Sequence, residues 1–156
     1  MIQRADHTVI TRADRVEAGE DLTRLFSELV GHEAVPDAGR INALIEAGTL
    51  AFYVAGDRDR IIAMASVIAC RTAVSDKLWI EDVCVLGEYR GQGIGRRLME
   101  YVMTDAVACF GPGTFWLTSR PSRLAARQMY RSLGFTEHET GVFRMDADNF
   151  NGRSPH

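Results

Sequence analysis

Three glycines lie close together where a predicted strand meets a predicted helix, in the segment Arg90-Gly91-Gln92-Gly93-Ile94-Gly95-Arg96. Glycine lets the backbone approach a ligand closely and adopt conformations that other residues avoid. The first N–H groups of a helix have no partner inside the helix, so they attract an anion. Arg90, Arg96 and Arg97 add positive charge beside them. The segment therefore predicts a site for a phosphate or diphosphate group, and a ligand-free turn eased by its glycines is the alternative.

Two other phosphate-binding motifs fit this segment poorly. A P-loop would end in Gly-Lys-Ser/Thr, which the sequence lacks. A dinucleotide fingerprint GxGxxG beginning at Gly91 would need Gly or Ala where Arg96 stands, and no convincing acidic ribose partner follows about 20 residues on. On these residues alone, the identity of the phosphate ligand stays open.

Two blocks of sequence together resemble the GNAT-type N-acetyltransferase superfamily. The first is an Arg-x-x-Gly-x-Gly motif that begins at Arg90, after the run of residues 80–85, and it looks like the acetyl-CoA-binding motif of that family. The second, residues 126–135, looks like the family's following helix, with the pattern A-x-x-x-Y-x-x-x-G-F. The resemblance covers about residues 75–146. It implies acetyl-CoA as co-substrate and direct transfer of the acetyl group to a primary amine of a small molecule or a protein.

The resemblance also implies the coenzyme contacts. Backbone N–H groups of residues 83–85 would bind the thioester oxygen and the amide arm of the coenzyme. Many relatives carry Asn seven residues before the tyrosine of the second block, whereas this chain has Arg123, whose guanidinium would reach a phosphate instead. The predicted coenzyme-binding residues are Val83, Cys84, Val85, Arg90, Gly91, Gln92, Gly93, Ile94, Gly95, Arg96, Arg123 and Tyr130.

Acetyl transfer to an amine needs a proton acceptor for the amine and a proton donor for the departing thiolate. Glu81 is the candidate base because it lies on the strand that should flank the thioester, and Asp82 is the alternative, since alternation sends the two side chains to opposite faces. Tyr130 is the candidate acid, because its hydroxyl pKa of about 10 lies close to that of a thiol. A strand-end charge and a core tyrosine are the purely structural interpretations of these residues.

Other reactive side chains fit no catalytic arrangement. Cys84 has no histidine near it in sequence, so a small apolar role suits it better than a nucleophilic one. The four histidines show no paired ligand spacing, so we predict no metal site. Three widely spaced cysteines make a disulfide framework unexpected.

These residues need a mixed α/β fold to bring them together. Apolar periodicity and turn residues predict the order β-α-α-β-β-β-α-β-α-β, a mixed central sheet flanked by helices. The helix after the glycine turn should join two parallel neighbouring strands, 79–86 and 114–118. The other predicted strands are 7–12, 50–55, 61–71 and 142–145. The predicted helices are 18–30, 93–109, 122–133 and a shorter one that carries Ile41, Leu44 and Ile45 and stops at Gly48.

Composition limits the class of protein. The chain has 156 residues, of which 46% are hydrophobic and 25% charged, and we predict a single domain over 1–148 with a loose tail over 149–156. A net charge of −3 argues against a general nucleic-acid binder. The longest apolar stretch, residues 61–70, is too short to cross a membrane, and the N-terminus lacks the apolar core of a signal peptide. We therefore expect a cytoplasmic protein, with no membrane or nucleic-acid partner.

The sequence says less about the amine that accepts the acetyl group than about the acetyl donor. Residues 1–88 hold nine Lys and Arg against fifteen Asp and Glu, which favours a cationic amine near the first half of the chain. Specificity should lie in residues 18–48 and in the loops 71–78 and 136–142. Two other functions stay open, an acyl-CoA-binding sensor without catalysis and a nucleotide-phosphate binder. Dimers are common in such families, so the resemblance admits a homodimer.

Overall fold

The computed structural model describes residues 7–147, so the predicted tail over 149–156 lies outside the described residues, and the single domain over 1–148 stays a prediction. The elements follow the predicted order up to the last predicted strand. In chain order they are β1 (Thr8–Ala13), α1 (Glu20–Val30), α2 (Ala38–Glu46), β2 (Leu50–Asp57), β3 (Arg60–Arg71), β4 (Asp76–Val85), the 3-10 turn η1 (Gly87–Tyr89), α3 (Ile94–Phe110), β5 (Thr114–Trp116) and α4 (Leu124–Ser132).

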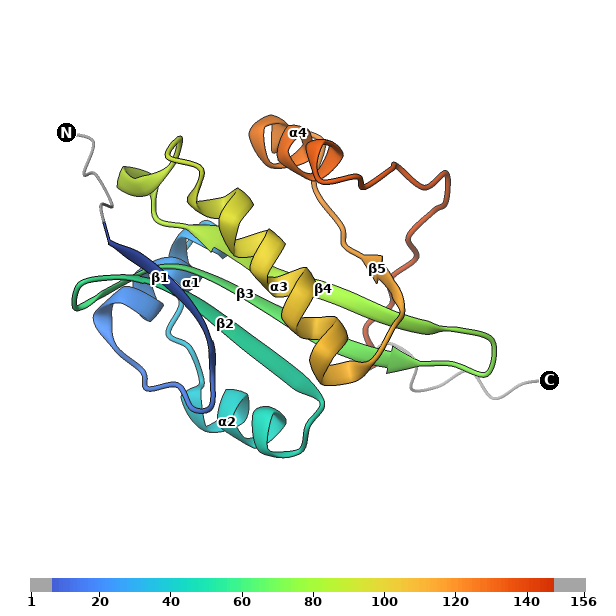
Figure 1. Ribbon diagram of the computed structural model, residues 1–156, viewed down its shortest axis with the longest axis horizontal. Coiled ribbons are helices and arrows are strands. Elements are labelled where there is room, and N and C mark those ends of the chain that lie inside the picture. The colour runs from blue at the N-terminus through green and yellow to red at the C-terminus, as the bar shows by residue number, and fades with distance from the viewer. Residues whose placement is uncertain (1–6, 148–156) are drawn as a thin grey trace.

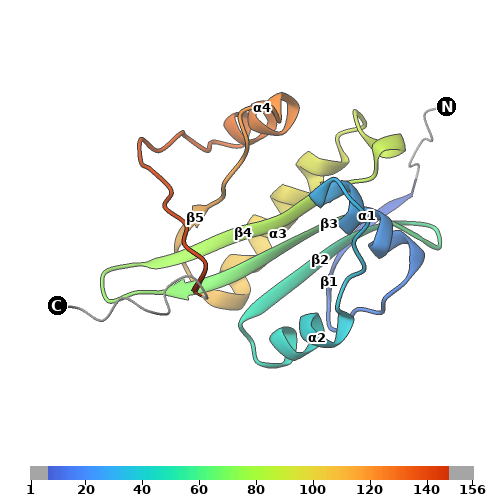
Figure 2. The same cartoon turned by 180° about the vertical axis from the view of Figure 1, so that it is seen from behind.

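One five-stranded sheet organises the fold, with the strands in the order β1-β2-β3-β4-β5. The first three pairings are antiparallel, whereas β4 and β5 are parallel and joined by α3, as predicted. Helix α3 crosses one face of the sheet, and α1 and α2 lie on the other (Figures 1 and 2). The predicted mixed α/β fold is confirmed.

Apolar side chains explain why the helices lie where they do. Leu22 and Leu25 of α1 and Leu98 and Val102 of α3 are at most 1% exposed, so each helix turns one stripe toward the sheet. Helix α1 ends at Gly31, whose φ of 82° is a left-handed conformation that glycine adopts without strain. The core therefore consists of two helix–sheet layers that share the central strands.

The β4–β5 pairing is short. It joins only Lys77–Trp79 to Thr114–Trp116. Beyond Trp79 the two strands separate, and α4 lies above the gap beyond the β4 edge (Figure 1). The sequence predicted a strand over 114–118, but β5 ends at Trp116 because the chain leaves the sheet there. The edge of β4 beyond Trp79 is therefore unpaired on the side of β5.

A β-bulge interrupts β4 beside this gap. Met64 lies opposite Cys84 but Ser66 lies opposite Glu81, so β4 carries one residue more than β3 over this stretch. Asp82 takes up the extra residue with a φ of 55°, a left-handed conformation that aspartate tolerates better than most residues. The bulge changes the direction of the side chains that follow it.

The predicted last strand over 142–145 is wrong, since residues 135–146 have no regular secondary structure. A strand formed by these apolar residues would need at least one face to be covered. Instead Val142, Phe143 and Met145 are 79%, 98% and 66% exposed, and β5 offers only three residues of strand beside them. The segment runs along the molecule without joining the sheet (Figure 2).

Candidate functional site

A cavity of about 700 Å³ opens between β4, the start of α3 and α4. Its walls include the end of β4, the glycine turn and the first turns of α4. The cavity is lined by Glu28, Leu29, Val83, Cys84, Val85, Tyr89, Arg90, Gly91, Gly93, Ile94, Gly95, Arg96, Ser122, Arg123, Leu124, Ala125, Ala126, Met129 and Tyr130. All but one of the twelve predicted coenzyme-binding residues are in this set, so residues spread over 83–130 of the sequence line one cavity.

The glycine turn forms the anion-binding end of the cavity. Gly91 and Gly93 have φ values of 76° and 73°, and a Cβ at either would meet no atom within 4 Å, so the conformation, not crowding, requires glycine there. Gly93 is also the N-cap of α3, and it has no side chain to accept from the first N–H groups of the helix. These N–H groups stay available to an anion, which fits a diphosphate.

Gly95 allows close packing behind the turn. A Cβ at this position would lie 3.3 Å from Met129 Sδ and 3.5 Å from Val85 Cγ2. A Cβ here would press on the Met129 thioether, which would have to move by a few tenths of an ångström. The glycine therefore keeps the three walls of the cavity close together.

The exposed edge of β4 supplies a second set of backbone groups. Since β5 pairs only as far as Trp79, residues 80–85 keep their outward N–H and C=O groups free of β5. Val83, Cys84 and Val85 line the cavity along this edge. Such a ladder suits an extended chain with amide groups, like the arm of coenzyme A.

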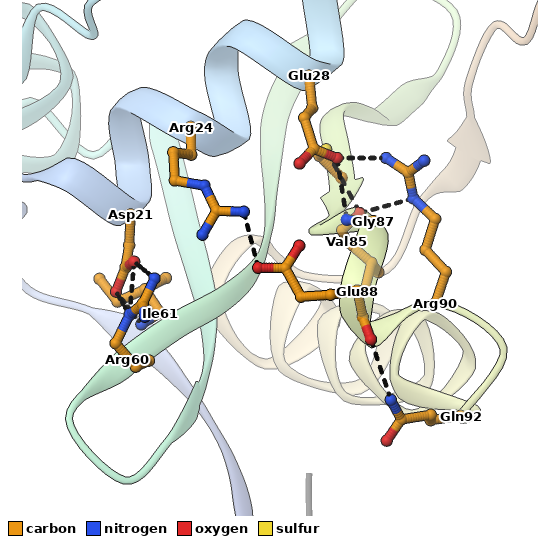
Figure 3. A network of polar contacts seen from close by, with 11 residues as sticks. Asp21, Arg24, Glu28, Arg60, Ile61, Val85, Gly87, Glu88, Arg90 and Gln92 are labelled. Carbon is orange, nitrogen blue, oxygen red and sulfur yellow. Dashed lines mark hydrogen bonds and ion pairs between the residues drawn. The ribbon is translucent and has the colours of Figure 1, made fainter. Parts of the chain in front are cut away.

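Three arginines surround the cavity and all contact protein groups. Arg90 Nε donates to the Val85 carbonyl at 2.8 Å and its Nη2 donates to Glu28 Oε2 at 2.7 Å (Figure 3). Arg96 Nη1 donates to Ser132 Oγ at 2.7 Å, which ties α3 to α4. Arg123 Nη2 donates to the Leu29 carbonyl at 2.9 Å, and so connects α4 to the end of α1.

Glu81 and Asp82 lie at the bulge, outside the lining of the large cavity. Ser66 is the cross-strand partner of Glu81, so their side chains share a face, yet Ser66 Oγ donates to Asp82 Oδ2 at 2.6 Å. The expectation that alternation sends the two carboxylates to opposite faces is therefore wrong, because the left-handed Asp82 breaks the alternation. Glu81 also accepts a hydrogen bond from the indole of Trp79.

Tyr130 stands between two cavities. It lines both the large cavity and a second one of about 690 Å³ between β5, α4 and residues 136–142. The residue is 8% exposed, and its ring packs edge-on against Phe135, with ring centroids 5.9 Å apart. Burial raises the pKa of the Tyr130 hydroxyl, and the positive charge of Arg123 partly opposes this shift. The hydroxyl therefore holds its proton at neutral pH.

The second cavity has an aromatic wall. Trp79 and Trp116 lie parallel, with ring centroids 6.0 Å apart, and His138 packs on Trp116 at 5.0 Å. Trp116 Nε1 and Ser119 Oγ are buried without a hydrogen-bond partner. Lys77 Nζ lies 5.1 Å from the Trp116 ring, which shows that this ring face accommodates a cation.

Some residues differ from the sequence prediction. Gln92 does not line the large cavity, and its side chain donates to the Glu88 carbonyl at 3.5 Å. Glu28 and Leu29 line it although no motif marks them, because their proximity to the glycine turn arises from the packing of α1. Among residues 7–147 no cluster of three or more His, Cys, Asp or Glu is arranged to hold a metal ion.

Comparison with known proteins gives a consistent result. The model of the Acetyltransferase (GNAT) family matches residues 16–135. A [ribosomal protein bS18]-alanine N-acetyltransferase from Escherichia coli K12 is 36% identical over 72 residues, which is 46% of this chain and 48% of that protein. The chain thus matches about half the length of this curated relative.

Solved structures share the fold at low identity. An aminoglycoside acetyltransferase from an uncultured soil metagenomic sample, in complex with trehalose, has a TM-score of 0.73 at 20% identity, over 92% of this chain and 98% of that one. A Clostridium acetobutylicum protein described as a predicted acetyltransferase, solved with acetyl-CoA, has a TM-score of 0.71 at 14% identity, over 93% and 99% of the two chains. Over residues 7–147, none of the helices has the length and apolarity needed to span a membrane.

Proposed function

The chain belongs to the GNAT family of acetyltransferases, and on this premise we propose that it transfers the acetyl group of acetyl-CoA directly to a primary amine. The observation that carries the proposal is the single cavity that joins the glycine turn, the open edge of β4 and Tyr130. Acetyl-CoA supplies the activated acyl group as a thioester.

The large cavity suits coenzyme A along its whole length. The helix N-terminus after Gly93 would hold the diphosphate, because its N–H groups have no side-chain acceptor. The backbone edge of Val83 to Val85, apart from the Val85 carbonyl that accepts from Arg90, would pair with the amide arm and donate to the thioester oxygen. Backbone donors at a developing oxyanion are typically worth about 3 kcal/mol.

Glu81 and Tyr130 take the two proton-transfer roles in this proposal. A free alkyl amine has a pKa of about 10.4, so only about one molecule in two thousand is uncharged at neutral pH. Glu81 would accept the amine proton, directly or through water, while the nitrogen attacks the thioester carbon. Tyr130 would donate its proton to the sulfur as the carbon–sulfur bond breaks. The raised pKa of Tyr130 keeps the hydroxyl protonated at neutral pH, as a proton donor requires, although it also makes the hydroxyl a weaker acid.

The second cavity is the proposed site of the acceptor amine. It meets the coenzyme cavity at Tyr130, and its wall includes Trp79, whose indole donates to Glu81. An amine bound there would meet Tyr130 in the cavity wall, whereas Glu81 lines neither cavity and would take the amine proton through water. The similar proteins act on a protein alanine or, by name, on aminoglycosides, so both protein and small-molecule amines fit the proposal.

Thiol release from acetyl-CoA, followed with a panel of small amines and amine-bearing peptides, tests the proposal. We expect amine-dependent turnover with at least one class of acceptor. An acyl-CoA-binding sensor would instead gain thermal stability from acetyl-CoA, by about 2.7 kcal/mol at 100 times the dissociation constant, with no turnover for any amine. A nucleotide-phosphate binder would gain more stability from NAD or ATP than from coenzyme A.

A further inference from the structure

Glu28 occupies a junction between α1 and the glycine turn. Its Oε2 accepts two hydrogen bonds, from the Gly87 N–H at 3.0 Å and from Arg90 Nη2 at 2.7 Å (Figure 3). The Arg90 guanidinium in turn donates through Nε to the Val85 carbonyl at 2.8 Å. A single carboxylate therefore fixes a backbone N–H and an arginine of a turn that lies about 60 residues further along the chain.

Glu28 is the last of three charged residues along one side of α1. Asp21 pairs with Arg60 of the β2–β3 hairpin, and Arg24 Nη2 contacts Glu88 Oε1 at 2.7 Å (Figure 3). The spacing of 21, 24 and 28 places the three on one face of the helix. Of these three α1 side chains, only Glu28 lines the large cavity, so it alone connects the helix to the proposed coenzyme site.

The contacts with Glu28 and Val85 orient the Arg90 guanidinium but leave some of its N–H donors available. A guanidinium has five N–H donors, and the two contacts described above involve only Nε and one Nη2 hydrogen. Arg90 also lines the cavity, so its remaining donors are close to the anion-binding end. An unpaired arginine side chain would lose rotamer freedom on binding a phosphate, and this entropy loss would weaken binding. A side chain that Glu28 already holds in place has lost that freedom before the phosphate binds.

We propose that Glu28 is a positioning residue for the coenzyme diphosphate, acting through Arg90 and the Gly87 N–H. This inference rests on the proposed function, because it assumes that the large cavity binds coenzyme A. Oε2 of Glu28 is directed at the two donors that it holds, the Gly87 N–H and Arg90 Nη2. Removing the charge would free the Arg90 side chain and loosen the turn.

The test is the dissociation constant of coenzyme A, measured by calorimetry on the full chain. Glu28→Gln keeps an oxygen for the Gly87 N–H but loses the ion pair with Arg90, and we expect it to bind coenzyme A about tenfold more weakly. Arg24→Gln is the matched control, because it removes a neighbouring α1 ion pair whose α1 residue is outside the cavity lining. The control should keep the wild-type dissociation constant.

A second measurement separates positioning from general loosening of the fold. In an Arg90→Gln background the Glu28→Gln substitution should have almost no further effect on coenzyme binding, because its target is gone. With S-acetylpantetheine, which lacks the diphosphate, as the donor, kcat/KM should be the same for wild type and Glu28→Gln.

The outcomes distinguish this inference from the proposed function. If wild type registers no binding of coenzyme A, the proposed function fails and this inference with it. If wild type binds but Glu28→Gln binds equally well or more tightly, only the positioning role fails. Equal losses in Glu28→Gln and Arg24→Gln would likewise overturn it, because both would then act through the docking of α1 alone.

Discussion

Ser66 Oγ donates a hydrogen bond of 2.6 Å to Asp82 Oδ2, and so fixes the one residue of β4 that has a left-handed backbone. Ser66 is itself fully buried on the neighbouring strand. The bond anchors the bulge to β3. The adjacent carboxylate, Glu81, takes no part in it and instead accepts a hydrogen bond from the Trp79 indole. Asp82 therefore holds the bulged backbone, whereas Glu81 is the carboxylate to which the proposed mechanism gives the role of base.

Glu81→Gln should lower kcat/KM about 100-fold at pH 7, since a general base contributes at least that much. The glutamine oxygen can still accept from Trp79, so the fold should persist. The difference in kcat/KM between wild type and variant should become smaller as the pH approaches the pKa of the free amine, because more of the acceptor is then already uncharged. The measurement is the pH dependence of thiol release.

Asp82→Asn is the comparison: it retains an acceptor for Ser66 and tolerates a positive φ, so its activity should stay within threefold of wild type. A larger loss in Asp82→Asn would transfer the role of base to Asp82.

Tyr130→Phe should lower kcat about 100-fold and leave the dissociation constant of coenzyme A nearly unchanged. The ring still packs on Phe135, so only the proton donor is lost. Because burial raises the pKa of Tyr130 above its ordinary value near 10, wild-type kcat should show no loss from this group below about pH 10. Steady-state kinetics from pH 6 to 10 check both statements. Unchanged turnover in the variant would exclude Tyr130 from catalysis.

Gly93→Ala should destabilise the fold by about 1 kcal/mol, because alanine resists a φ of 73°. As the strained turn relaxes, the helix N–H groups should shift away from the anion, and binding of coenzyme A should weaken roughly tenfold. Gly48→Ala is the matched control: its φ is 66° and its Cβ space is equally open, but it lies outside the cavity lining. Urea unfolding and calorimetry should show similar stability losses for both variants and a binding loss for Gly93→Ala alone.

Asp21→Asn should lower the free energy of unfolding by about 1 kcal/mol at pH 7. Arg60 donates to this carboxylate, the Ile61 N–H also donates to it, and together they lower its pKa. A carboxyl whose pKa is lowered in the folded state stabilises the protein above its ordinary pKa near 3.9, and this contribution disappears as the pH falls through the lower folded value. Urea unfolding between pH 7 and 3 should therefore show the wild-type advantage shrinking below about pH 4. Asp59→Asn, an exposed carboxylate of the same hairpin, should make little difference at any pH, and an advantage that persisted at pH 3 would contradict the account.

Local signals predicted the elements and the glycine turn well. The apolar stripe of Leu22 and Leu25 fixes α1, and the positive φ of Gly91 and Gly93 is what their residue type suggested. These features depend on neighbours within one or two turns of the chain. Short-range chemistry is therefore sufficient to anticipate them.

Features that depend on distant partners were not predictable. The contact of Glu28 with Arg90 spans 62 positions, and nothing in α1 distinguishes this glutamate from its other acids. Strict alternation could not reveal the bulge at Asp82, because the extra residue shows only against β3. The apolar pattern of residues 142–145 predicted a strand, but a pattern supplies no partner strand, and β5 is too short to provide one.

The short β4–β5 pairing makes β5 the most weakly attached strand of the sheet. Three residue pairs fasten β5, and with it the chain that leads to α4, to the remaining strands. Beyond them β5 does not pair with β4, and a long ligand lying along that edge would take the place of the missing strand. Binding of such a ligand would then also stabilise the C-terminal part of the fold.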